Sequence, residues 1–196
     1  MVTPFNFKSI ECGCKVTIFF QEMLEIYGRA KDCYYYASQL EPSFTNDKLH
    51  ATNKFPALQK FKYATSRISI IDLSNLYKEN SYYRFTKLLN ILADKTNGVF
   101  PDNGEQLSFL RTKVLQTINQ HEKLLDMRDM QFAHHDSFER IYPKQFNAVR
   151  YTDVKVFFDD TLDLLKLFSN ILQYNGHLHN PIWEGELAAM LYKLAN

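Results

Sequence analysis

The residues most able to do chemistry in this chain lie in one short stretch, residues 128–136, which reads RDMQFAHHD. Arg128 carries a permanent positive charge, and His134 and His135 titrate near neutral pH. A guanidinium can bind a phosphate, and an imidazole can take up or release a proton at physiological pH. The stretch therefore predicts a site that binds a phosphate group and transfers a proton.

Which histidine shares a face with Arg128 depends on whether the helix that carries them is continuous. At about 100° of rotation per residue, His135 falls within roughly 20° of Arg128, and His134 falls about 120° away. A bend near Ala133 would instead turn His134 inward. Both histidines therefore remain candidates, and Asp136 can orient an imidazole by hydrogen bonding.

A long amphipathic helix is expected to position this stretch. Its apolar residues recur mostly at three- and four-residue steps, which is typical of one buried helical stripe. They are Leu110, Val114, Ile118, Leu124, Leu125 and Phe132. We expect one helix from about Glu105 to Ala133. On such a helix His121 shares the face of Arg128, so it could line the same cleft or be a histidine satisfied by a partner at an interface. An arginine and a histidine at a helix end can also simply bind the terminal carbonyl groups.

The rest of the chain also has the periodicity of helices. They are expected at residues 14–40, 57–77, 82–93 and 152–174, with a short last helix at 186–194. Ser81 is the expected cap of the third of these, and Gly176 is expected to end the fourth. The second should bury an apolar side made of Leu58, Phe61, Ile68, Ile71, Leu73 and Leu76. The sequence predicts an all-α, up-and-down bundle of about five to six helices.

Length and composition indicate a single soluble domain over residues 1–196, with an irregular lead-in at 1–13 and a C-terminal extension at 175–196. The net charge of +1 predicts no general affinity for nucleic acid, so RNA contact would need a local basic patch. With no apolar run long enough to span a membrane and no leader, we expect a cytoplasmic protein without a membrane partner. Cys12 and Cys14 lack a second ligand pair at zinc spacing, so neither a metal nor a cofactor is expected.

The motif resembles that of a known superfamily. Arg128-Asp129, followed by Ala133-His134-His135-Asp136, is similar to the Arg, polar residue, spacer and His of the HEPN superfamily. The closer resemblance is to its AbiU-like abortive-infection branch, in which Arg-Asn-Lys precedes Ala-His-x-Asp. Residues 70–92 also resemble that branch, and the similarity covers about residues 14–174. Asp129 departs from the pattern, because a neutral polar residue is commoner there.

The resemblance implies a helical bundle that forms a homodimer, with Arg128 and His134 of both subunits in one cleft. In active members such a site cleaves RNA without a metal, often in toxin–antitoxin or phage-defence systems, so RNA and a cognate antitoxin are implied partners. The resemblance favours His134 over His135 as the catalytic histidine. Asp129, His135 and Asp136 complete the candidate site.

RNA cleavage without a metal needs a base for the 2′-hydroxyl, an acid for the leaving oxygen and a cation for the charged transition state. One chain supplies half of this set, so activity requires a dimer. Arg140, Lys144 and Arg150 follow the motif and are candidate phosphate contacts, although they fit a solvated surface equally well.

The leading hypothesis is therefore a HEPN-like, metal-independent endoribonuclease, a toxin or abortive-infection protein. The alternative is a catalytically inactive helical interaction or RNA-binding protein of the same fold. A metal-dependent hydrolase is disfavoured because no Glu-x-x-His pair occurs in the chain.

Overall fold

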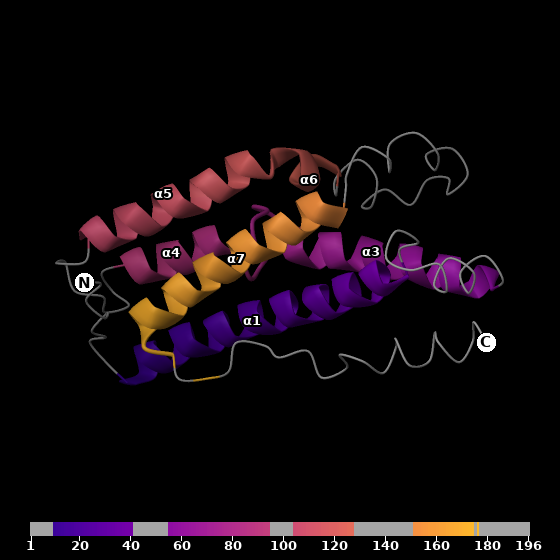
Figure 1. Ribbon diagram of the computed structural model, residues 1–196. Helices are drawn as coiled ribbons and strands as arrows, with labels where there is room; N and C mark the ends of the chain where they lie inside the picture. The colour runs from indigo at the N-terminus through magenta and orange to yellow at the C-terminus, as the bar shows by residue number, and fades with distance from the viewer. Residues whose placement is uncertain (1–9, 41–54, 95–103, 128–150, 175, 177–196) are drawn as a thin grey trace.

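The computed structural model describes residues 10–40, 55–94, 104–127, 151–174 and 176. Every regular element within these ranges is a helix, which confirms the predicted all-α bundle (Figure 1). The helices are α1 (Ile10–Gln39), α3 (Pro56–Asn75), α4 (Phe85–Ala93), α5 (Gly104–Gln120), α6 (Glu122–Met127) and α7 (Tyr151–Leu172). None of these helices is long and apolar enough to cross a membrane.

The helices alternate in direction, as expected for an up-and-down bundle. Figure 1 shows α1 running one way, α3 and α4 returning end to end beside it, α5 running out again and α7 returning. The α1–α3 pair makes the most extensive helix contact, α4 packs on α1 and α5, and α7 packs on α1 and α5. Large side chains buried between these helices form the core, including Phe20, Met23, Leu73, Phe85, Leu88, Leu110, Phe157 and Phe168.

Small side chains are buried on both α1 and α3, the two helices with the most extensive contact. Ala30 and Ala37 are fully buried on α1, and Ser66 and Ser69 are buried on α3. Small residues let two helix backbones approach closely. The hydroxyl of Ser69 donates to the carbonyl oxygen of Ser66 at 2.7 Å, so its polar group is satisfied inside the contact.

Two helix starts differ from the sequence-based expectation. α1 begins at Ile10, within the stretch expected to be irregular, and it includes Gly13, whose carbonyl oxygen accepts a hydrogen bond from Thr17 at 2.8 Å. α4 begins at Phe85, so the prediction of Ser81 as its cap is wrong. The backbone N–H of Phe85 donates to the carbonyl oxygen of Leu76 at 2.9 Å, and this bond holds the first residue of α4 to the segment that follows α3.

The end of α7 also differs, because Gln173 and not a glycine closes the helix. Gln173 adopts a left-handed conformation with φ of 50°. The N–H of Tyr174 donates to the carbonyl oxygen of Ser169 at 2.9 Å, and the N–H of Gln173 donates to that of Asn170 at 3.4 Å. These two bonds make a Schellman cap. The ring of Tyr174 packs edge-on against Phe20, with centroids 5.4 Å apart, which holds the cap on α1.

The expected apolar side of α3 is only partly correct. Leu73 and Leu76 are buried, but Phe61 and Ile68 are each 42% exposed. The buried face of α3 turns out to contain the small hydroxyl residues Thr65, Ser66 and Ser69. The expected short helix at residues 186–194 lies outside the described residues.

Candidate functional site

The predicted site falls in the connection between α6 and α7. α6 ends at Met127 and α7 begins at Tyr151, and residues 128–150 between them lie outside the described residues. This connection contains the candidate catalytic and RNA-binding residues: Arg128, Asp129, His134, His135, Asp136, Arg140, Lys144 and Arg150. Their side-chain geometry, including which histidine faces Arg128, therefore stays a prediction.

The structure does describe the frame on which this connection begins and ends. Figure 1 shows α5 and α6 running opposite to α7, so that the end of α6 and the start of α7 lie at the same end of this helix pair. Gln120 and His121 reach across to Asp160 of α7, and α6 also contacts α3. Both ends of the candidate stretch are therefore anchored in packed helices.

The helix that leads into the candidate stretch bends at His121. α5 ends at Gln120 and α6 begins at Glu122, so the expectation of one uninterrupted helix through this point is wrong. The N–H of His121 is shared between the carbonyl oxygens of Thr117, at 3.1 Å, and Ile118, at 3.3 Å. Past the bend, the adjacent Leu124 and Leu125 are both buried, 4% and 5% exposed.

This bend removes one geometric relationship that the sequence suggested. His121 and Arg128 would share one face only on an unbroken helix. Because the helix bends at His121, the seven-residue spacing no longer places the two side chains on the same face. The physical reason for the bend is tertiary: it lets the imidazole of His121 and both leucines of α6 pack inward.

The imidazole of His121 is held by a carboxylate and an aromatic ring. Its Nε2 lies 2.7 Å from Oδ2 of Asp160, and because an ionised carboxylate can only accept, Nε2 carries the proton. The ring stacks on Phe157 with centroids 4.5 Å apart and an interplanar angle of 29°. Gln120 donates its side-chain amide to the same Asp160 oxygen at 2.9 Å.

Exposure decides what this pair can do. The His121 side chain is 6% exposed and that of Asp160 is 34% exposed, so substrate has little access to the imidazole. A general acid or base must reach the atom whose proton it moves. The pair therefore acts as a structural link between the bend and α7, which confirms the interpretation of His121 as a histidine satisfied by a partner.

Asp160 belongs to a turn of α7, residues 157–161, that receives contacts from three sides. We call this turn the α7 hub. Tyr77, which follows α3, has its hydroxyl 2.8 Å from that of Thr161. Thr161 donates its only hydroxyl proton to the carbonyl oxygen of Phe157 at 2.7 Å, so Tyr77 is the donor to Thr161. Tyr27 of α1 donates to the carbonyl oxygen of Phe158 at 3.3 Å.

Both tyrosines are kept in the neutral form. Burial, above all, raises the pKa of Tyr77 well above its ordinary value of 10.0, and Asp160 adds to the effect. Burial likewise raises the pKa of Tyr27, with Asp159 and Asp163 contributing. These hydroxyls are hydrogen-bond donors that hold the bundle together, not groups that exchange protons near neutral pH.

A second polar cluster links α1 to α3. Nε of Arg29 lies 2.6 Å from Oδ2 of Asp72, whose side chain is 12% exposed. The hydrogen bond to Asp72 raises the pKa of Arg29. Burial raises the pKa of the nearby Cys33 thiol, and Asp72 and Asp32 raise it further against the opposing effect of Arg29. Cys33 is thus held as the thiol, which is a poor nucleophile.

Few features of the sequence identify these hydrogen-bond partners. Asp160 lies three residues after Phe157, which is buried on α7, and this spacing places Asp160 near the buried side of the helix. That placement is the signal that could have singled it out. Within the described ranges, no group of three or more His, Cys, Asp or Glu residues could hold a metal ion.

Comparisons of the chain with protein-family models, with curated proteins and with solved structures give no match. The resemblance to the HEPN superfamily therefore rests on the motif residues and on the stretch that precedes them.

Proposed function

We propose that this chain is a HEPN-like, metal-independent endoribonuclease of the AbiU-like, abortive-infection type. It acts as a homodimer, in which Arg128 and His134 of both subunits form one composite site. The observation that carries the proposal is the position of the motif. It starts at the residue that follows α6, in an all-helical bundle whose α5–α6 bend is tied to α7.

Anchoring of α6 supports a site at this point of the chain. Leu124 and Leu125 are buried on α6, and His121 is bonded to Asp160 at the bend before it. Catalytic groups work best when a rigid element sets their starting position. Arg128 is the first residue after such an element.

The proposed chemistry uses the same residue types from two subunits. One His134 imidazole removes the proton of an RNA 2′-hydroxyl, and the oxygen attacks the adjacent phosphorus. The two Arg128 guanidiniums stabilise the additional negative charge on the phosphate oxygens. The other His134, as an imidazolium, protonates the departing 5′-oxygen. The products are a 2′,3′-cyclic phosphate and a free 5′-hydroxyl. The bond from phosphorus to the 2′-oxygen replaces the bond to the 5′-oxygen, and one proton is taken up and one is released.

Cleavage of a labelled single-stranded RNA in the presence of EDTA tests this proposal. We expect Arg128→Ala and His134→Ala each to lower the rate by about 10²-fold or more, the range typical of a lost acid, base or charge-stabilising group. Lys123→Ala, an exposed basic residue on α6, is the matched control and should retain the wild-type rate.

Circular dichroism spectra must show that each variant keeps its helices. Full activity in both the Arg128 and His134 variants would contradict the proposal, as would a wild-type dimer that binds RNA without cleaving it. The second result would favour the inactive RNA-binding protein instead. Parallel loss of growth inhibition by the two variants in cells would support a toxin or abortive-infection role.

A further inference from the structure

An apolar stripe runs along the solvent-facing side of α3. Its members recur at steps of four, three, four and three residues: Ala57, Phe61, Ala64, Ile68 and Ile71. At about 100° per residue, all five lie within roughly 40° of one line along the helix. Phe61 and Ile68 are each 42% exposed, and the two alanines are also exposed. Ile71 is partly buried and packs against the hydrophobic core, so the exposed part of the stripe runs from Ala57 to Ile68. We call this set the α3 stripe.

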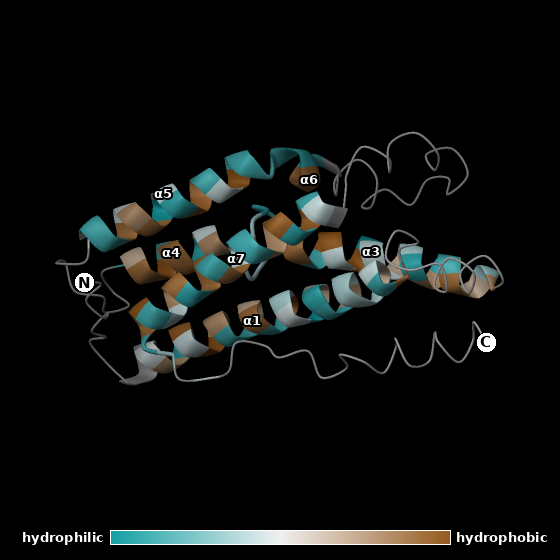
Figure 2. Ribbon diagram, viewed as in Figure 1, coloured by the Kyte–Doolittle hydropathy of each residue, from teal (hydrophilic) through white to brown (hydrophobic). Residues whose placement is uncertain are grey.

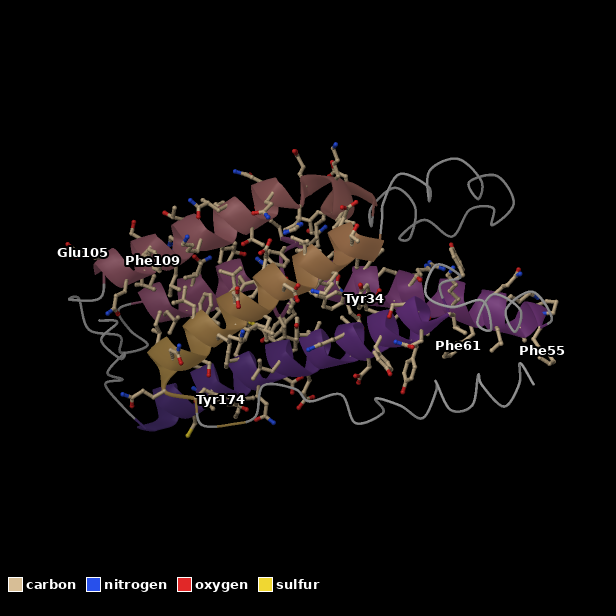
Figure 3. The ribbon with its side chains drawn as sticks, in the orientation of Figure 1. Tyr34, Phe55, Phe61, Glu105, Phe109 and Tyr174 are labelled. Carbon is tan, nitrogen blue, oxygen red and sulfur yellow. The ribbon has the colours of Figure 1, made fainter. Side chains whose placement is uncertain are left out.

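The opposite face of α3 is firmly held, so the stripe sits on a rigid support. Ser66, Ser69 and Leu73 are buried on that face, and α3 makes its most extensive contact with α1. Figure 3 labels Phe61 on the half of α3 that extends past α6 and α7, and Figure 2 shows hydrophobic positions recurring along this helix. The ring of Phe61 contacts Tyr36 of α1, with centroids 6.1 Å apart.

The spacing of the stripe is that of a coiled-coil seam. Apolar residues at alternating steps of three and four mark the positions by which one helix packs against another. The small residues Ala57 and Ala64 alternate here with the larger Phe61 and Ile68. The small residues leave spaces between the two large side chains. Such a surface fits the apolar side chains of a second helix.

Charge along the edge of the stripe indicates the character of that helix. Lys60 and Arg67 are seven residues apart and lie on the same edge of the stripe, where coiled coils carry the charges that choose a partner. Of the residues of α3, Asp72 alone is acidic, and it is bonded to Arg29 at 2.6 Å. The α3 residues along this edge of the stripe are therefore basic.

We propose that the α3 stripe docks an amphipathic helix of a partner protein that carries acidic residues beside its apolar side. A second copy of this chain fits less well. An antiparallel two-fold pair of α3 helices would bring Lys60 of one copy opposite Arg67 of the other. RNA also fits less well, since bases need aromatic stacking surfaces and the stripe is mostly aliphatic. The proposal is independent of the nuclease site.

A synthetic helical peptide serves as the probe for this docking. It carries leucines at alternating three- and four-residue steps and glutamates on the flanking positions, and a matched peptide carries lysines there. We expect the full-length protein to bind the glutamate peptide by fluorescence anisotropy, more weakly as salt rises, and to bind the lysine peptide at least about tenfold more weakly.

Substitutions then locate the binding surface. Phe61→Ser and Ile68→Ser should each weaken binding of the glutamate peptide about tenfold or more, as loss of a central apolar contact does. Leu115→Ser removes another exposed hydrophobic residue, 56% exposed on α5, and should leave binding unchanged. The double variant Lys60→Glu, Arg67→Glu should prefer the lysine peptide.

Three results would overturn the proposal. One is the absence of binding by the glutamate peptide at millimolar concentration. Another is an equal loss of binding in the Leu115 variant, which would indicate general hydrophobic adhesion. The third is a wild-type dimer that Phe61→Ser converts to a folded monomer, because the stripe would then be occupied by a second copy.

Discussion

Nε2 of His121 lies 2.7 Å from Oδ2 of Asp160, and this bond joins the bend between α5 and α6 to the middle of α7. The same turn of α7 receives Tyr77 and Tyr27, from the end of α3 and from α1. The α7 hub therefore holds three parts of the bundle in register. It also fixes the helix from which the Arg128–His134 motif begins.

Removal of the carboxylate at the hub should destabilise the bundle. Asp160→Ala leaves the buried His121 imidazole without its partner, and we expect a loss of about 1–3 kcal/mol in the free energy of unfolding. Urea denaturation followed by circular dichroism measures this loss. Asp163→Asn is the control, because Asp163 is exposed and pairs with an exposed lysine, and such pairs contribute less than about 1 kcal/mol. Equal stability of the Asp160 variant and the wild type would contradict the structural role.

Ser74 offers a test in the opposite direction. Its side chain is fully buried, and its hydroxyl has no hydrogen-bond partner in the part of the chain that the structure describes. Since an unsatisfied buried hydroxyl costs about 1–3 kcal/mol, Ser74→Ala should raise the free energy of unfolding by about 1 kcal/mol.

Ser69→Ala provides the matched comparison for Ser74. The Ser69 hydroxyl is also buried but donates to the carbonyl oxygen of Ser66 at 2.7 Å, so its removal should not stabilise the fold. Chemical denaturation of both variants distinguishes the two cases. A destabilised Ser74→Ala protein would show that the hydroxyl has a partner.

The cap of α7 predicts a stabilising glycine. Gln173 has φ of 50°, a conformation that costs a residue with a side chain about 1–2 kcal/mol and that glycine adopts readily. Gln173→Gly should therefore raise the thermal midpoint of unfolding. Asn170→Gly, at an exposed position inside α7, should instead lower stability by about 0.3–0.5 kcal/mol, because asparagine is itself a poor helix former. A fall in stability with Gln173→Gly would mean that the side chain contributes more than the backbone strain costs.

Tyr77 predicts how stability depends on alkaline pH. Because its pKa in the fold is raised above the unfolded value, its contribution is complete below about pH 10 and is lost as the pH rises beyond it. In that range the free energy of unfolding should fall by about 1.4 kcal/mol per pH unit for each such tyrosine.

Tyr77→Phe removes the hydroxyl whose ionisation makes the stability depend on alkaline pH. It should be less stable than the wild type at neutral pH, because the bond to Thr161 is lost, yet it should lose stability less steeply above about pH 10. Urea unfolding at a series of pH values gives both slopes. Equal slopes of unfolding free energy against pH for the two proteins would show that folding does not raise the pKa of Tyr77.

The sequence was sufficient for the helical content and for the order of the helices, because apolar residues at three- and four-residue steps report burial of one face. The sequence pattern did not predict the features that depend on tertiary contacts. The bend at His121 depends on Asp160, which lies 39 positions further along the chain. The start of α4 depends on a bond from Phe85 to Leu76. Phe61 and Ile68 fit a buried pattern equally well, but the small residues on the other side of α3 pack against α1 instead.

The candidate site was likewise predictable in its residue types but not in its tertiary contacts. Residue types and spacing were enough to single out Arg128 and His134, since a guanidinium and an imidazole in one short stretch have a recognisable chemistry. The pattern could not identify the anchors of that stretch. Asp160 and Gln120 look like ordinary surface residues until the fold brings them to His121.

The central claim is that two subunits contribute His134 to one RNA-cleaving site, and mixing wild-type with His134→Ala protein tests it most directly. If cleavage needs both histidines, a mixed dimer is inactive, and activity follows the square of the wild-type fraction. An equal mixture, after subunit exchange, should then keep about one quarter of the wild-type activity per total protein. Retention of about one half, the result for subunits that act independently, would contradict the composite site.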